Sequence, residues 1–159
     1  MKLRIMLMLS ASIIALLLAG CEKPMVGSDV QGGWVAEKAS QQKWIKGTNR
    51  CHITLRADGT FIASVPDYMM TTSDKASGQV ISGKGQWNLE PPKALAPVGI
   101  GLSFSEVDGK RKNWSVSNTL KAARGKQGSH LFFYVREEGG ERFVFERALG
   151  QASINATEK

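Results

Sequence analysis

Short runs of alternating hydrophobic and polar residues dominate the chain from residue 34 onwards. Such runs, separated by turn-forming Gly, Asp and Asn residues, are typical of β-strands with one buried face. We expect a first strand at Trp34 and further strands at 51–56, 60–65, 79–89, 98–105, 112–116, 131–135 and 142–147. Residues 117–125 instead have the pattern of a short helix, with Ser117 or Asn118 as its cap and Gly125 as its terminator.

The hydrophobic pattern also indicates the register of the hairpin around Asp58-Gly59. A three-residue loop, 57–59, with Gly59 in the left-handed conformation brings the apolar residues of both strands onto one face. The expected pairs are Leu55–Phe61, Ile53–Ala63 and Cys51–Val65. Cys51 is therefore expected to be a buried core thiol, while the neighbouring His52 points to the opposite face.

The spacing of the expected strands favours an all-β meander, because no strand–helix–strand alternation argues for a parallel sheet. Eight antiparallel strands can close into an up-and-down barrel, which removes the unpaired edges of an open sheet. A two-sheet β-sandwich is the alternative. Gly83 and Gly85, inside the expected strand 79–89, indicate a bend or a close approach of two strands.

The first twenty residues have a different pattern. Lys2 and Arg4 precede an apolar run at 5–18, and Leu18-Ala19-Gly20-Cys21 resembles the lipobox of bacterial lipoproteins. The resemblance implies that residues 1–20 are a signal peptide that is removed, and that Cys21 is lipidated. Three acyl chains would anchor the protein firmly to a membrane. Because Glu22 rather than an aspartate follows Cys21, we expect the outer membrane of a bacterial envelope, on its periplasmic or surface face.

A second resemblance concerns the domain that follows. Gly32-Gly33-Trp34 matches the Gly-x-Trp start of lipocalin-like (calycin) barrels, and Arg147 lies where such barrels carry an arginine that packs over the tryptophan. The resemblance implies a lipocalin-like barrel whose base is closed by Trp34 and Arg147. We expect a lipidated cysteine and tether at 21–31, the barrel domain at 32–150 and a loose tail at 151–159.

The residue types that carry catalysis are sparse. His52 and His130 lie on different expected strands without ligand-spaced companions, and no nucleophile–base pair or phosphate-binding loop is present. We therefore expect no enzymatic activity, metal or cofactor. Loss of Lys2 and Arg4 with the signal peptide lowers the formal net charge from +7 to +5. A nucleic-acid partner is not expected in the envelope.

One basic stretch stands out against this background. It contains no acidic residue, and its members are Lys110, Arg111, Lys112, Lys121, Arg124 and Lys126. A charge run of this kind is commonly a solvated face. Its functional interpretation is contact with an anionic surface, either lipid headgroups, lipopolysaccharide phosphates or an acidic protein.

A few aromatic residues and methionines are the remaining candidates for contacts. Tyr68-Met69-Met70 is predicted to be an exposed apolar stretch next to the long connection 71–77, and Trp87 and Trp114 either line a cavity or belong to the core. Two functions remain open. The preferred one is a protein-interaction or envelope accessory module with a filled barrel, and the alternative is a barrel that binds a small apolar or amphipathic ligand.

Overall fold

The computed structural model describes residues 25–70, 75–91, 97–115, 119–125, 128–136 and 138–149, with the side chains of 112–115 excepted. The expected signal peptide, Cys21 and the tail 151–159 lie outside the described residues.

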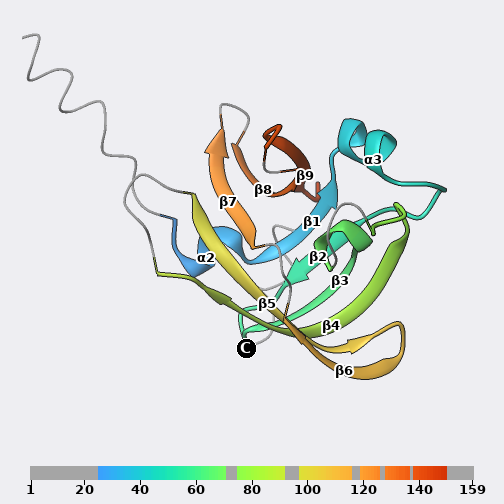
Figure 1. Ribbon diagram of the computed structural model, residues 1–159. Coiled ribbons are helices and arrows are strands. Elements are labelled where there is room, and N and C mark those ends of the chain that lie inside the picture. The colour runs from blue at the N-terminus through green and yellow to red at the C-terminus, as the bar shows by residue number, and fades with distance from the viewer. Residues whose placement is uncertain are drawn as a thin grey trace, which may run out of the picture.

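Antiparallel strands close into a single barrel (Figure 1). They are β1 (Gly32–Ala36), β2 (His52–Leu55), β3 (Thr60–Pro66), β4 (Val80–Leu89), β5 (Val98–Val107), β6 (Lys110–Ser115), β7 (Leu120–Gly125), β8 (Gly128–Arg136) and β9 (Glu141–Arg147). The pairing of β1 with β9 closes the sheet. Because β6 and β7 pair with successive parts of β5, they share one position in the wall, and the barrel is eight-stranded. The predicted all-β barrel is confirmed, and the sandwich alternative is wrong.

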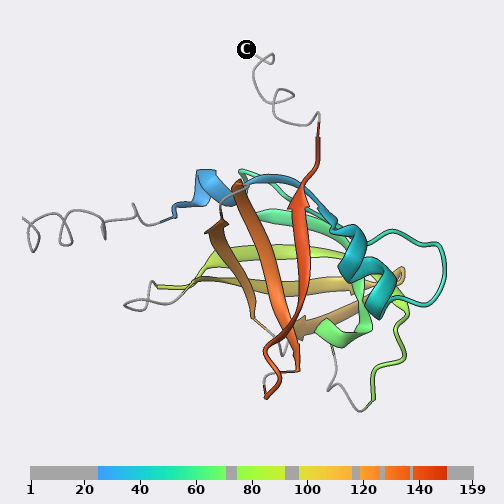
Figure 2. The same ribbon diagram turned by 90° about the horizontal axis from the view of Figure 1, so that it is seen from above.

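Short helices mark the two ends of the barrel. Helix α2 (Gly27–Val30) precedes β1, and helix α3 (Lys38–Trp44) follows it, so the two lie at opposite ends (Figure 2). We call the end with α2 the base and the end with α3 the rim. The 3-10 helix η1 (Asp67–Met69) follows β3 and therefore belongs to the rim.

The β2–β3 hairpin has the predicted register. Leu55 pairs with Phe61 and Ile53 with Ala63, and Gly59 has a φ of 80° in the connecting loop. Cys51 is buried, as predicted, and burial raises the pKa of its thiol to about 12. The pattern of apolar residues was sufficient here because a slip of one residue would turn the apolar side chains of one strand towards solvent.

The prediction of a helix at 117–125 is wrong, since Leu120–Gly125 forms strand β7. Leu120 and Ala122 are buried, and Lys121 alternates with them. Residues 120–122 of this segment pair with β5 and residues 121–125 with β8, and this pairing overrides the helix propensity of its Leu, Lys and Ala residues.

Large apolar side chains fill the barrel. Those that are fully buried in the core cluster include Trp34, Phe61, Phe133, Phe143, Phe145, Leu55, Ile100, Leu120 and Leu131. Phe61 meets Phe104 edge-on at a centroid distance of 4.8 Å. Gly83 makes room for this pair, since a Cβ atom there would lie 2.5 Å from the Phe104 ring. The glycines of β4 thus mark the predicted close approach of strands.

Candidate functional site

Trp34 lies at the centre of the barrel base. Its side chain is fully buried, and its indole Nε1 donates a hydrogen bond of 2.8 Å to the carbonyl oxygen of Val30 in α2. Trp34 pairs with Arg147 across β1 and β9, and the guanidinium carbon of Arg147 lies 4.1 Å from the centroid of the indole ring. The contact implied by the Gly-x-Trp resemblance is therefore present.

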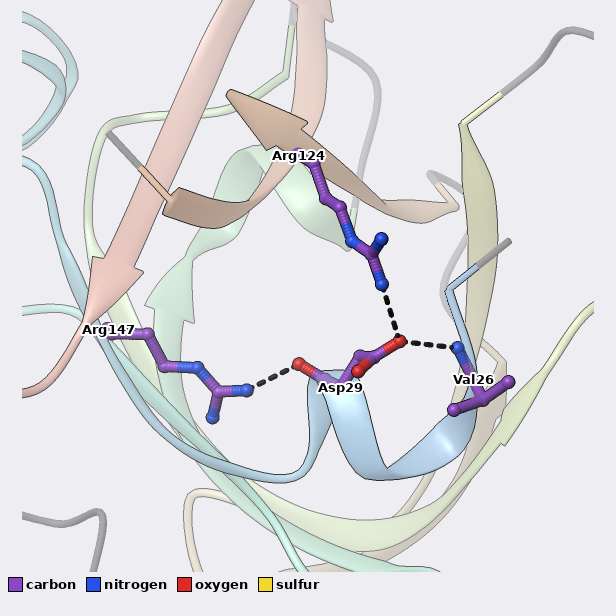
Figure 3. Close-up of polar contacts among 4 residues, drawn as sticks. All are labelled: Val26, Asp29, Arg124 and Arg147. Atoms are coloured by element: carbon purple, nitrogen blue, oxygen red, sulfur yellow. Dashed lines mark hydrogen bonds and ion pairs between the residues drawn. The ribbon is translucent and has the colours of Figure 1, made fainter. Parts of the chain in front are cut away.

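Asp29 and two arginines fasten α2 to the barrel (Figure 3). Arg147 donates to the backbone carbonyls of Gln31 and Asp29. The Asp29 carboxylate accepts a 2.9 Å hydrogen bond from the Val26 amide and pairs with Arg124 of β7 at 3.1 Å. Burial lowers the pKa of Arg147, and the Asp29 carboxylate opposes this shift. The base is consequently held by charge-assisted hydrogen bonds from two strands.

Helix α2 falls within residues 21–31, the segment expected to be a tether. Val30 is fully buried, so this part of the segment packs on the barrel. Gly32, between α2 and β1, has a φ of 112°, and a Cβ atom there would lie 2.7 Å from an Arg147 nitrogen. A glycine is needed at this point because the chain turns in the left-handed region directly against the arginine.

At the rim, two polar side chains hold α3 in place. Ser40 accepts a 3.1 Å hydrogen bond from the Val144 amide of β9 and donates one to the Glu37 carboxylate. Gln41 donates to the Asn49 carbonyl and accepts from the Cys51 amide. These bonds fix the helix and the connection 45–51 against the barrel wall, although the helix has only seven residues.

Trp44, the last residue of α3, is half-buried at the rim. Its ring meets Tyr68 of η1 edge-on at 5.7 Å, and Lys43 Nζ lies 4.7 Å from its centroid. Lys43 also pairs with Glu141 at 2.7 Å, and this contact holds the pKa of the Glu141 carboxyl below its ordinary value. Among the residues that the structure describes, none accepts a hydrogen bond from the Trp44 indole N–H.

The predicted apolar contact residues differ in their exposure. Tyr68 is half-buried, but Met69 is 0% and Met70 8% exposed, so the prediction of an exposed stretch is wrong for both methionines. The reason is that η1 folds over the rim and turns them into the core. Trp87 packs against the core, and its indole N–H donates to the Arg56 carbonyl at 2.9 Å. The side chain of Trp114 lies outside the described residues.

The basic stretch is distributed over the height of the barrel. Lys110 and Arg111 are exposed beside the β5–β6 turn at the rim, Lys121 lies over the Tyr134 ring at 4.7 Å, and Arg124 binds Asp29 at the base. The chain runs from the rim to the base of the barrel between Arg111 and Arg124, so residues that are near in the sequence are far apart in the structure. The Lys112 side chain and Lys126 lie outside the described residues.

Two cavities open on the outer wall. One, of about 620 Å³, lies over β3, β4 and β5 among polar side chains that include Thr60, Gln86 and Ser103. The other, of about 580 Å³, lies beside β8 and β9 and contains His130, Glu37 and Glu146. Within the described ranges, no group of three His, Cys, Asp or Glu side chains could hold a metal ion. No helix in the same part of the chain is long and apolar enough to cross a membrane.

No protein-family model, curated protein or solved structure matches this chain significantly.

Proposed function

We propose that this chain is a lipid-anchored, non-catalytic interaction module of a bacterial envelope, with a lipocalin-like barrel as its rigid body. The filled interior of the barrel is the observation that carries this proposal. Trp34, Phe61, Phe133, Phe143 and Phe145 are all fully buried inside it. Pockets that enclose a small molecule have volumes of about 300–1,000 Å³ and surround most of the ligand. Both described cavities instead are lined mainly by residues of the outer wall, with the core residues Phe61 and Phe104 at the floor of the first, which favours binding through the surface.

The base supports the proposed anchor. Helix α2 begins at Gly27, six residues after Cys21, and is fastened to the barrel through Asp29 and Arg147. Six residues in an extended chain span at most about 21 Å. A lipidated Cys21 would therefore hold the base next to the membrane and leave the rim facing away from it. The contact of Arg147 with Trp34 supports the lipocalin-like assignment.

Native mass spectrometry of the full chain, purified from its own envelope in mild detergent, tests this function. We expect a lipidated protein whose mass is otherwise that of the bare chain, together with a complex that contains a second protein. A small molecule that remains bound in the folded state and leaves on unfolding would instead support the ligand-binding barrel. A Cys21→Ala variant provides the control for the anchor, since it should lose the acyl chains and leave the membrane fraction.

A further inference from the structure

Segment 38–50 of the rim is rich in positive charge, and the neighbouring Asp67 carboxylate is engaged by hydrogen bonds from Ser77 and Gly78. Residues 38–50 contain four basic residues and no acidic one, and all four basic side chains are exposed. Lys43 is paired with Glu141. No carboxylate of the described part of the chain lies within 4 Å of Lys46 or Arg50. These two cations follow the end of α3 and are open to a negatively charged partner.

Trp44 differs from the other tryptophans whose side chains the structure describes. Trp34 and Trp87 each donate their indole N–H to a backbone carbonyl, at 2.8 and 2.9 Å. The Trp44 N–H has no such acceptor among the described residues, and its ring is only half-buried against Tyr68. Tryptophan and tyrosine at a partly apolar, partly wet surface are the residue types that dominate the energy of protein interfaces.

The position of Trp44, Tyr68, Lys46 and Arg50 in the barrel indicates which kind of partner they can reach. They lie at the rim, beyond the far end of β1 from α2 (Figures 1 and 2). An anchor at Cys21 would keep the base within about 21 Å of the membrane, so the lipid surface that receives the anchor would be at the end opposite the rim. Charge complementarity then favours an acidic protein over anionic lipid, and the aromatic pair supplies the apolar contact that such a partner needs.

We infer that Trp44, Tyr68, Lys46 and Arg50, together called the rim patch, dock an acidic segment of an envelope protein. This inference rests on the proposed function and specifies the surface through which it acts. The indole N–H of Trp44 donates to a carboxylate or carbonyl of the partner, and Lys46 and Arg50 bind its carboxylates. Neither the basic stretch 110–126 nor the two methionines of the predicted apolar stretch takes part.

Site-specific photocrosslinking in the intact envelope tests the rim patch. The full chain carries p-benzoylphenylalanine either at Gln42 on α3 or, as a matched control, at Gln86 on the outer wall of β4, since both glutamines are exposed. We expect an adduct with a single protein from position 42 and none from position 86. Mass spectrometry should place the crosslink within or beside a segment of the partner that is rich in Asp and Glu.

The residues of the patch are then changed in the Gln42 background. Lys46→Glu combined with Arg50→Glu should reduce the adduct by at least about tenfold, because it replaces two attractions with two repulsions. The control Arg56→Glu combined with Lys110→Glu changes the charge equally at two exposed positions outside the patch and should leave the adduct unchanged. Trp44→Phe keeps an aromatic ring but removes the N–H and part of the apolar surface, so a reduced adduct with an unchanged melting temperature assigns the effect to the Trp44 indole and not to folding.

The outcomes separate this inference from the proposed function. A protein adduct at Gln42 that survives the charge reversal, or an adduct with lipid or polysaccharide there, overturns the rim patch. A protein adduct from Gln86 alone overturns it too, but leaves the interaction module intact with its surface on the wall. Absence of a protein adduct at both positions also overturns the rim patch. If native mass spectrometry then finds a small molecule inside the barrel, the proposed function as an interaction module fails as well.

Discussion

The base and the rim of this barrel combine the same residue types in opposite ways. At the base, a tryptophan is fully buried, its N–H is bonded, and the arginine that packs on it donates to the carbonyls of Asp29 in α2 and of Gln31, which follows the helix. At the rim, Trp44 is half-buried beside a lysine and a tyrosine, and no described residue accepts from its N–H. An indole and a cation thus stabilise the fold at the base, where backbone carbonyls accept their hydrogen bonds, whereas the indole N–H at the rim is left open for the partner that we propose.

Truncation of each tryptophan should separate the two ends most clearly. Trp34→Ala removes a fully buried ring and is expected to lower the free energy of unfolding by about 3–5 kcal/mol. Trp44→Ala removes a half-exposed ring and should cost less than about 1.5 kcal/mol. Urea unfolding of both variants measures the difference. Equal losses would show that the rim tryptophan is as structural as the one at the base.

Replacement of Arg147 by lysine should have the next largest effect. A lysine keeps the charge but lacks the planar fork with which Arg147 reaches the carbonyls of both Gln31 and Asp29. We expect Arg147→Lys to destabilise the protein by about 1–2 kcal/mol. Amide hydrogen exchange should rise at 26–31 more than in the strands. Lys43→Arg at the rim is the matched control, and a similar loss there would remove the distinction between the ends.

The reactivity of Cys51 shows whether solvent reaches only the surface of the rim or also the core beneath it. The residue follows the exposed Arg50 but is itself buried, and the pKa of its thiol is raised to about 12. Its folded-state pKa lies above the ordinary value of 9.0, so its contribution to stability is complete below pH 9.0 and is lost as the pH rises towards 12. Iodoacetamide at pH 8.5 should therefore modify the unfolded chain and spare the folded one. Rapid labelling of folded protein would mean that the connection 45–51 opens.

The smallest effect is expected at the ion pair of Lys43 and Glu141. The pKa of Glu141 is held below its ordinary value of 4.5, first by the hydrogen bond from Lys43. The contribution of this pair is present above pH 4.5 and is lost as the pH falls through the folded-state pKa of the carboxyl. In a carboxyl NMR titration, Lys43→Ala should return the Glu141 midpoint towards 4.5. An unchanged midpoint would show that Lys43 is free to serve the rim patch.

The barrel could be predicted from sequence because its signals are local and repeated. Alternation located most strands, and the register of the β2–β3 hairpin followed from the requirement for one apolar face. The segment Leu120–Gly125 was mistaken for a helix because it is short, rich in helix-forming residues and has only Leu120 and Ala122 as buried positions. Its conformation is decided by pairing with β5, which lies well before it in the sequence, and with β8, which follows it. A pattern read within the segment does not contain these partners.

The central contact at the base could be predicted from the sequence, whereas those at the rim could not. The contact of Trp34 with Arg147 could be anticipated because a known motif carries both residues. The rim was missed because α3 has no apolar periodicity, and the helix is held by hydrogen bonds that the side chains of Ser40 and Gln41 accept from the amides of Val144 and Cys51. The available signal was a tryptophan within a basic segment, 38–50, that lacks acidic residues. The stretch 110–126 has the stronger charge pattern in the sequence, but its described cations Lys110, Arg111, Lys121 and Arg124 are spread along the wall by the strands.

The central claim is that the base stabilises the fold while the rim binds a partner. Amide hydrogen exchange tests it most directly when the full chain is compared in native envelope membranes and after purification in detergent. In the purified protein, residues 26–31 should already exchange slowly, because Asp29 and Arg147 close the base, while 38–50 should exchange faster. In the envelope, we expect protection to increase at 38–50 and to stay unchanged at 26–31. Increased protection on the outer wall, with 38–50 unchanged, would contradict a rim that binds and a base that only holds the fold.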